Sequence, residues 1–218
     1  MTGATTSPAA TMKLVGGDLC LDFVNTVGGR EAEGPRGAVQ VREDKLRDYG
    51  DLVAWSRHAG VATEDRGREL ARQAGRRPAE AAAVLARARG LREALYRVLR
   101  ALMDGGRPDA GDLEALNDEV ADARRREKLV AGGGRLRWEA AEDAEPLASL
   151  LWPVGRAASA LLTSGDLSRL RECGGDGCGW LFLDQSRNRS RQWCTMEDCG
   201  NLSKVRRFRR KRRQRRSR

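Results

Sequence analysis

Apolar residues recur at helical spacing over most of the first three quarters of the chain. The clearest case runs from Pro78 to residue 103, where one continuous apolar stripe predicts a long amphipathic helix. Its apolar positions are Ala81, Val84, Leu85, Ala88, Leu91, Leu95, Val98, Leu99 and Leu102. The opposite side holds Arg87, Arg89, Arg92, Glu93 and Arg97, which we expect to face solvent. This helix should therefore pack one side on a core.

Shorter helices are predicted on both sides of this long one. The segment 18–27 begins at Asp18, a plausible N-cap, and should end at Gly28 and Gly29. Further helices are predicted over 48–60, 64–74, 112–128 and 146–162. The last of them should end at Ser164 and Gly165, and residues 30–47 are interpreted as a charged loop.

Two segments have the apolar pattern of short strands. Residues 129–138 predict a β-hairpin that turns at Gly132–Gly134. Residues 180–183, WLFL, predict a strand that pairs with returning residues 192–193. We therefore predict an α+β fold, with a disordered tail over 1–11 and a mostly helical domain with a small β-hairpin over 12–165. A small treble-clef-like module with a basic C-terminal helix follows over 166–218.

The net positive charge of the protein comes entirely from this last module. The 218 residues have a formal net charge of +10. Residues 1–165 contain 25 basic and 25 acidic side chains, whereas residues 166–218 contain 16 basic and 6 acidic ones. Such a distribution indicates that one module binds an acidic partner. Nucleic acid is favoured over a membrane surface, because no paired apolar face accompanies the charge.

The basic residues of this module fall in two segments. Residues 201–218 contain 11 basic and no acidic side chains, and Leu202, Val205 and Phe208 recur every third position. We expect these apolar residues to dock a helix on the module, with 212–218 either continuing it or forming a disordered tail. The predicted phosphate contacts are Arg187, Arg189, Arg191, Lys204, Arg206, Arg207, Arg209 and Arg210. The loop and the helix start are expected to form one continuous basic surface.

Four cysteines in the same module have the spacing of a metal site. Cys173, Cys178, Cys194 and Cys199 form two Cys-x4-Cys pairs that are 15 residues apart. Two close pairs can supply the four thiolates of one tetrahedral zinc ion, and a closed shell of this kind is structural rather than catalytic. Two disulfides or an iron–sulfur cluster are the alternatives. The fifth cysteine, Cys20, is interpreted as a core residue.

The sequence offers little support for catalysis or for a membrane location. His58 is the single histidine, and no P-loop or GxSxG motif occurs. Asp22 and Asn25 interrupt an apolar helix; we favour hydrogen bonds to neighbouring backbone, with a ligand pocket as the alternative. Arg30 and Arg42 are interpreted as solvated, or else as partners of an anionic ligand. We expect no enzyme.

The location follows from what the chain lacks. No stretch reaches the roughly 18 apolar residues of a membrane span, and residues 1–13 have no apolar signal core. A reducing cytoplasm, with association to the nucleoid, is expected.

Two motifs resemble known families. The segment CGGDGCGWLFLDQSRNRSRQWCTMEDCGNLSKVRRFRRK resembles the CGNR zinc finger, although Leu202 stands where the family has arginine. The segment GGDLCLDFVNTV resembles the opening of the ABATE domain, the usual companion of that finger. The resemblance covers about residues 12–205 and implies a stress-induced bacterial transcription regulator. It also implies DNA binding by the finger and an unidentified small ligand in the first domain.

The residues and the resemblance together predict a DNA-binding transcription regulator. An RNA-binding or ribosome-associated zinc protein is the alternative, in which Trp180, Phe182 and Trp193 either stack on bases or pack in the module's own core. An enzyme tethered to nucleic acid is a third hypothesis. The oligomeric state is left open, and a homodimer is compatible with the sequence.

Overall fold

The computed structural model describes residues 6–32, 39–141 and 146–216. Helices account for 58% of the described residues, which confirms the mostly helical prediction. The α-helices are α1 (Leu19–Val24), α2 (Tyr49–His58), α3 (Glu64–Arg76), α4 (Pro78–Met103), α5 (Ala110–Arg126), α6 (Trp152–Ser164) and α7 (Asn201–Arg216). Short helical turns are η1 (Pro8–Ala10), η2 (Leu147–Leu150), η3 (Leu167–Arg169) and η4 (Met196–Gly200). The strands are β1 (Val27–Ala32), β2 (Val39–Asp44), β3 (Glu127–Gly132), β4 (Arg135–Ala140), β5 (Leu170–Glu172) and β6 (Leu181–Leu183).

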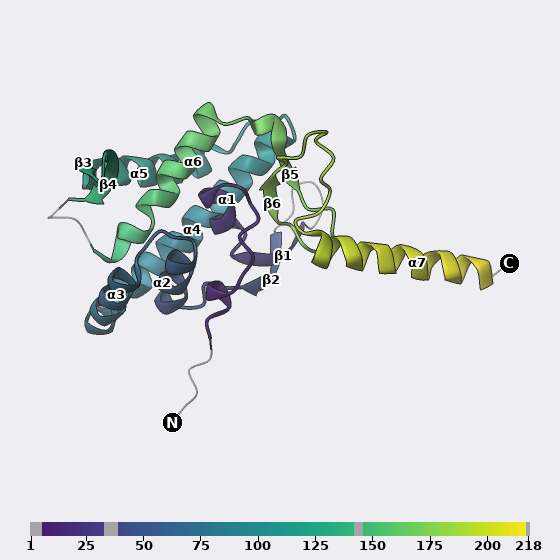
Figure 1. The fold of residues 1–218 in the computed structure, drawn as a ribbon, viewed down its shortest axis with the longest axis horizontal. Helices are drawn as coiled ribbons and strands as arrows, with labels where there is room; N and C mark the ends of the chain where they lie inside the picture. The colour runs from purple at the N-terminus through teal and green to yellow at the C-terminus, as the bar shows by residue number, and fades with distance from the viewer. Residues whose placement is uncertain (1–5, 33–38, 142–145, 217–218) are drawn as a thin grey trace, which may run out of the picture.

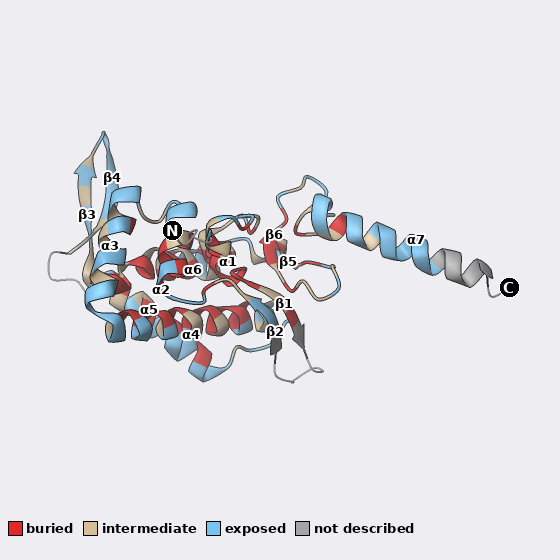
Figure 2. Ribbon diagram, turned by 90° about the horizontal axis from the view of Figure 1, so that it is seen from below, coloured by how far each residue is buried: buried red, intermediate tan, exposed pale blue. Residues whose placement is uncertain are grey.

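The long helix α4 lies at the centre of the structure, as its apolar stripe predicts (Figure 1). Leu95 and Leu99 on this stripe are fully buried, and α1, α2, α3, α5 and η2 all pack against α4. The rings of Phe23 and Trp55 meet in the same core, with 5.1 Å between their centroids. Figure 2 shows the buried side of α4 as an almost continuous band. Burial of this stripe is the main apolar contribution to the fold.

Side-chain caps explain where several helices begin. Asp18 accepts a hydrogen bond from the Cys20 N–H, and Asp48 and Thr63 cap α2 and α3 in the same way. The predicted helix over 146–162 is divided into η2 and α6. Pro153 lies in the first turn of α6, where its missing N–H leaves no hydrogen bond unmade.

The interpretation of residues 30–47 as a charged loop is wrong. This region contains an antiparallel hairpin in which Val27 of β1 pairs with Asp44 of β2, so α1 ends at Val24 rather than near residue 27. Gly28 and Gly29 lie inside β1. Gly29 has a φ of +70°, and a Cβ atom there would come within 2.6 Å of the Cβ of Arg42. Glycine at this position therefore allows the two strands to approach.

The charged side of α4 is solvated only in part, since Arg97 is exposed as predicted whereas Arg92 is buried and Arg87 is half-buried. Arg92 is 2% exposed, and its guanidinium donates to both carboxylate oxygens of Asp44 at 2.8 Å. Arg87 binds Glu119 of α5, and Arg97 binds Asp112. Strand β2 and helix α5 cover this side of α4. The arginines therefore form a layer of ion pairs between elements.

The predicted disordered tail is ordered in part. Residues 1–5 lie outside the described residues, but Pro8–Ala10 form η1 and Ala9 is fully buried. The Ser7 hydroxyl donates a hydrogen bond of 2.6 Å to Asp51 on α2.

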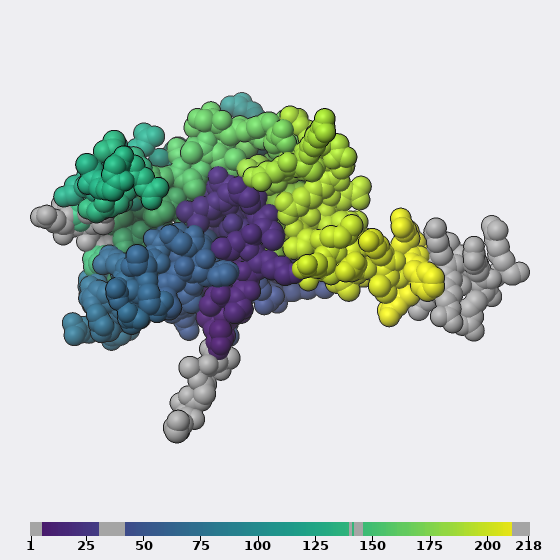
Figure 3. Space-filling model, viewed as in Figure 1, coloured from purple at the N-terminus to yellow at the C-terminus, as the bar shows by residue number. Residues whose placement is uncertain are grey.

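The first 165 residues and the C-terminal module share one hydrophobic core. Leu170 of β5 and Leu181 of β6 belong to the same buried cluster as Leu21, Leu95 and Val154. In Figure 3 the N-terminal segment lies between the α2–α3 region and the C-terminal module. We refer below to residues 6–165 as the body and to residues 166–216 as the finger.

The two ends of the molecule are formed by different elements. The β3–β4 hairpin lies at one end and α7 projects from the other (Figures 1 and 2). Among the described helices, none combines the length and the apolar character that a membrane crossing requires.

The buried ion pair between Arg92 and Asp44 gives a test of this arrangement. Asp44→Asn should lower the free energy of unfolding by about 2 kcal/mol, because it removes two charge-assisted hydrogen bonds and leaves Glu93 as the counter-charge of the buried Arg92 guanidinium. Urea denaturation at neutral pH measures this loss. The matched control is Asp65→Asn, which breaks an exposed ion pair with Arg68 and should cost less than about 1 kcal/mol.

The ion pair between Arg92 and Asp44 also sets how the stability difference between the wild type and Asp44→Asn depends on pH. Burial raises the pKa of Asp44, but the hydrogen bonds and charge of Arg92 outweigh it and hold the pKa below its ordinary value of 3.8. The stabilisation is therefore complete above that ordinary value and is lost as the pH falls through the pKa of the folded state. An equal loss of stability in Asp44→Asn and Asp65→Asn would contradict a stabilising role for the buried ion pair of Arg92 and Asp44.

Candidate metal centre and nucleic-acid interface

The four clustered cysteines bring their sulfurs together as the spacing predicts. All four Sγ atoms lie within 4.8 Å of one another. The Sγ of Cys194 is 3.8 Å from that of Cys178 and 3.5 Å from that of Cys199. A tetrahedral zinc ion with Zn–S bonds of about 2.3 Å separates its sulfurs by about 3.8 Å. The cluster therefore has the dimensions of a single-ion site.

Backbone turns place these sulfurs. Cys173 follows β5, and the turn to Cys178 closes with a hydrogen bond of 3.0 Å from the Cys178 N–H to the Gly175 carbonyl. A Cβ atom on Gly175 would lie 2.9 Å from the Sγ of Cys199, so glycine leaves room for the fourth ligand. Cys199 lies in η4, which continues into α7. The metal would therefore fix the first turn of that helix.

The predicted partner of the WLFL strand is wrong. Strand β6 pairs antiparallel with β5, with Leu181 opposite Glu172 and Leu183 opposite Leu170, rather than with residues 192–193. Gln192 instead accepts a hydrogen bond from the Gly174 N–H at 2.9 Å. The charged residues of β5 concealed its strand character from the sequence pattern.

The chemistry of the cluster fits zinc rather than its alternatives. All four cysteines are free of disulfide bonds. Hydrogen bonds from Cys178 and Cys194 lower the pKa of the Cys173 thiol, whereas the contact with Cys173 raises the pKa values of Cys178 and Cys194. Four thiolates this close together repel one another, so a cation among them would be needed to keep all four deprotonated. A multi-iron cluster would spread the sulfurs further apart than one ion does.

Asn25 joins this centre to the body. Its amide group donates to the Leu181 carbonyl at 2.8 Å and accepts from the Leu181 N–H at 2.9 Å. Asn25 is fully buried and lies 156 residues before its partner. The side chain thus makes the pair of hydrogen bonds that a neighbouring strand would make. We refer to this contact as the Asn25 clamp.

Three more hydrogen bonds reinforce the clamp. The Gly29 N–H donates to the carbonyl of the ligand residue Cys178 at 3.2 Å, and the Trp180 indole N–H donates to the Val27 carbonyl at 2.9 Å. The Leu183 N–H donates to the Gly16 carbonyl at 2.8 Å. Gly179 has a φ of +68°, and a Cβ there would meet the Cβ of Arg30 at 2.6 Å. The finger therefore rests on the backbone of the body.

Asp22 binds neighbouring backbone, the interpretation that the sequence favours, whereas Asn25 binds the backbone of a distant strand. Asp22 accepts a hydrogen bond of 2.8 Å from the Gly16 N–H, and burial raises the pKa of its carboxyl. Asp22 and Asn25 form the junction with the finger. Cys20 is fully buried, which confirms its assignment to the core.

Other polar residues of the body have structural partners. Arg30 is 5% exposed and pairs with Glu93, so its interpretation as a solvated or ligand-binding residue is wrong. His58 contacts the Met12 carbonyl at 2.7 Å through Nε2.

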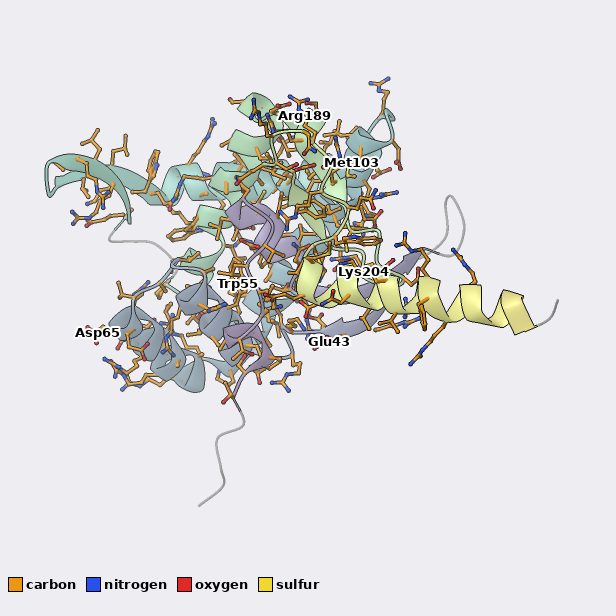
Figure 4. All side chains as sticks on the ribbon, turned by 45° about the vertical axis from the view of Figure 1, so that its right-hand side comes forward. Glu43, Trp55, Asp65, Met103, Arg189 and Lys204 are labelled. Atoms are coloured by element: carbon orange, nitrogen blue, oxygen red, sulfur yellow. The ribbon has the colours of Figure 1, made fainter. Side chains whose placement is uncertain are left out.

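The three arginines of the 187–191 loop have different environments. Arg191 lies 4.1 Å over the ring of Phe182 and donates to the carbonyls of Val15, Trp193 and Cys194. It thus holds the metal loop against the body. Arg187 and Arg189 are both exposed, and Arg189 binds the Ser168 hydroxyl at 3.0 Å. Figure 4 shows Arg189 well apart from Lys204, so at these positions the loop and the helix start do not form the predicted continuous surface.

Helix α7 projects away from the rest of the structure (Figure 1). Its main contacts are with η4. Leu202, Val205 and Phe208 are 56%, 46% and 66% exposed, so the prediction that they dock the helix on the finger is wrong. The chain enters α7 directly from the metal turn. The helix axis therefore points outward from the metal turn.

The basic residues of α7 surround this exposed helix. Arg206 makes an ion pair of 2.6 Å with Asp176, one helical turn after Leu202. Within the described part of the chain, no hydrogen bond or ion pair engages the side chains of Lys204, Arg207, Arg209 and Arg210. A hollow of about 280 Å³ lies at the helix base, lined by Ser203, Arg206, Arg207 and Arg210 together with the turn at Gly175 and Asp176.

Comparison with protein families identifies both regions. Residues 17–165 match the family described as "ABATE: Putative stress-induced transcription regulator". The chain belongs to the ABATE family. Residues 169–212 match the CGNR zinc finger, which covers all four cysteines and most of α7. The comparison with curated proteins gives no match. The ABATE region therefore ends where the finger begins in sequence, although the two share a core.

Sequence reasoning missed several residues that support the metal site. Lys13 reaches Glu197 and Asp198 of η4, at 3.1 and 2.7 Å, from an N-terminal segment without any recognisable pattern. The role of Gly179 had a partial signal, because a glycine directly after a metal-ligating cysteine suggests a positive φ.

Metal content tests the assignment of the four sulfurs. The purified protein should contain about one zinc ion per chain, and Cys194→Ser should lose it because three thiolates leave the coordination shell open. Elemental analysis by mass spectrometry measures both values. Cys20→Ala is the matched control and should keep its zinc, since Cys20 lies outside the cluster. Wild-type protein without zinc would refute the site.

Truncation of the clamp tests the junction between body and finger. Asn25→Ala should lower the free energy of unfolding by about 3 kcal/mol, because it leaves the buried N–H and carbonyl of Leu181 without partners. It should also speed the transfer of zinc to a chelator, because the metal turn loses its support. Asn201→Ala is the control, since Asn201 is exposed and bonds to the Glu197 carbonyl. Unchanged stability and zinc release in Asn25→Ala would exclude a clamp.

Proposed function

We propose that this ABATE protein is a transcription regulator that binds DNA through α7 and the finger, while the body supports the finger and receives a small effector. The observation that carries the proposal is the projection of α7 from the body with Lys204, Arg207, Arg209 and Arg210 unengaged by the described residues. The closely spaced positive side chains of such a helix repel one another unless a polyanion lies beside them. Phosphates on both sides of a DNA groove would supply that charge.

The dimensions of α7 suit the major groove. Its 16 residues span about 24 Å, and the major groove of B-DNA is wide enough to admit one helix. The exposed side chains of Leu202, Val205 and Phe208 would lose contact with water there. Apolar side chains in this groove can contact the methyl group of thymine. The apolar positions therefore offer a means of sequence discrimination beside the phosphate contacts.

The metal centre would set the direction of this helix. Cys194 precedes η4 and Cys199 lies within it, and Lys13 from the body binds the acidic residues of the same turn. The hollow at the base of α7 combines the Ser203 hydroxyl with three arginines, a donor set suited to a phosphate group. Contacts between this hollow and a phosphate of the DNA backbone would fix the position of the helix along the duplex.

The aromatic residues of the finger favour duplex DNA over single-stranded RNA. Phe182 is fully buried beneath Arg191, and the Trp180 indole is held by the Val27 carbonyl. Stacking on unpaired bases requires exposed aromatic faces. We propose no catalytic role, since the histidine and the buried carboxylates described above have structural partners.

Salt dependence tests the role of α7. The triple variant Lys204→Gln, Arg207→Gln and Arg210→Gln should bind duplex DNA more weakly. The slope of log affinity against log salt should flatten by about 0.9 for each phosphate contact removed. Fluorescence anisotropy over a range of salt concentrations measures this slope. Arg72→Gln on α3 is the matched control, because it removes an exposed arginine of the body.

A truncation after Gly200 gives a second, independent result. It removes α7 but keeps β5, β6 and the cysteines, so the shared core stays intact. We expect this protein to retain zinc and to lose DNA binding. Full affinity for DNA after truncation would overturn the proposal, as would tighter binding of structured RNA than of duplex DNA by the intact protein.

A further inference from the structure

The body contains a large cavity that none of the described contacts uses. It has a volume of about 800 Å³ and lies between the end of α2, the start of α3, the β3–β4 hairpin and the η2–α6 region. This volume is within the usual range for small-molecule sites. The cavity lies in the body, away from α7, which projects from the opposite end of the molecule.

The charge of the lining selects for anions. Arg66, Arg77 and Arg156 line the cavity from three different elements or junctions, and Glu127 is the one acidic side chain among the lining residues described. Glu127 is already paired with Arg156. Arg66 reaches only neutral oxygen atoms, the Ser149 hydroxyl at 3.2 Å and the Pro146 carbonyl at 3.4 Å. Its positive charge therefore has no acidic partner among the described residues.

The remaining lining is apolar and aromatic. Trp138 on β4 is 46% exposed, and the guanidinium of Arg156 lies 5.3 Å from the centre of its ring. Leu19, Val61, Leu150 and Pro153 contribute apolar side chains to the same cavity. A flat apolar group could thus lie along Trp138 while its charged end faces the arginines.

Two buried polar atoms in the lining lack partners. Trp152 is 1% exposed, and its indole N–H has no acceptor among the described residues. The Oε2 atom of Glu127 likewise has no donor, although the other carboxylate oxygen binds Arg156. Buried polar atoms without partners are uncommon in folded proteins and need an explanation. Both atoms are themselves inaccessible to solvent, so a molecule in the cavity would reach them only after side-chain movement.

We infer that this cavity binds a small organic acid, with a carboxylate or similar anionic group attached to an aromatic body. The anionic group lies at Arg66, since Arg77 is already paired with Glu80 and Arg156 with Glu127, and the aromatic body lies against Trp138. The role of this cavity as an effector site rests on the function proposed above. The cavity also includes Leu19, the first residue of α1, and that helix ends at the Asn25 clamp. A ligand at Leu19 would thus contact the element that holds the finger.

Calorimetry with naphthoate tests the ligand class. Naphthoate has an aromatic body and one carboxylate, naphthamide has the same shape without charge, and naphthylmethylammonium has the opposite charge. Naphthoate should bind at least about tenfold more tightly than naphthamide, the effect of one charge-assisted hydrogen bond. The cation should bind more weakly than naphthamide. Quenching of tryptophan fluorescence should accompany binding, since Trp138 and Trp152 line the cavity.

Three variants locate the site. Arg66→Gln should weaken naphthoate binding about tenfold and leave naphthamide binding unchanged, because it removes a charge but keeps a polar side chain. Arg72→Gln, on the same helix and outside the cavity, is the matched control and should bind as the wild type does. The double variant Lys204→Gln and Arg207→Gln controls for anion binding by the finger and should also bind as the wild type does.

The outcomes separate this inference from the proposed function. The calorimetric assay contains no DNA, so a protein that fails to bind DNA can still bind naphthoate. The inference is overturned if naphthoate does not bind, if it binds no more tightly than naphthamide, or if Arg66→Gln has no effect. It is also overturned if the finger variant, rather than Arg66→Gln, abolishes binding.

Discussion

The arrangement of the whole protein depends on the two hydrogen bonds between the Asn25 amide and the backbone of Leu181. Strand β6 has only three residues, and it pairs with the equally short β5. So small a sheet has little stability of its own. Asn25 provides a polar partner on the side of β6 that the body covers, and thereby lets Leu181 enter the body's core without unsatisfied backbone groups. The metal turns are then built on a strand that the body holds.

From this strand outward, each element is placed by the one before it. The connection between β5 and β6 provides two cysteines, and the returning chain provides two more at the entrance to α7. A cation at this point would link the strand that the body supports to the helix that projects from it. The direction of α7 is therefore set by covalent and metal geometry. This explains why the helix can keep apolar side chains exposed and basic side chains unpaired.

The sequence predicts features that repeat locally and misses those that depend on distant partners. The apolar stripe of α4 and the cysteine spacing are local, and both predictions are confirmed. The β1–β2 hairpin is concealed, because its glycines and charges resemble a loop. The burial of Arg92 follows from a carboxylate 48 residues away, and the exposure of Leu202, Val205 and Phe208 follows from the direction of α7. Neither has a signature in the neighbouring residues.

The shared core has a consequence for how this family could arise and be recombined. A zinc finger that folds around its metal alone can be moved between proteins as an independent cassette. Here Leu170 and Leu181 complete the core of the body, while Gly16, Asn25 and Val27 provide hydrogen-bonding partners for the finger. Without the other part, the body and the finger would each expose apolar side chains and unpaired hydrogen-bonding groups. A finger moved to another member of the family should therefore need the matching segment, residues 16–27, of its own body. The segment and the finger would then be inherited together.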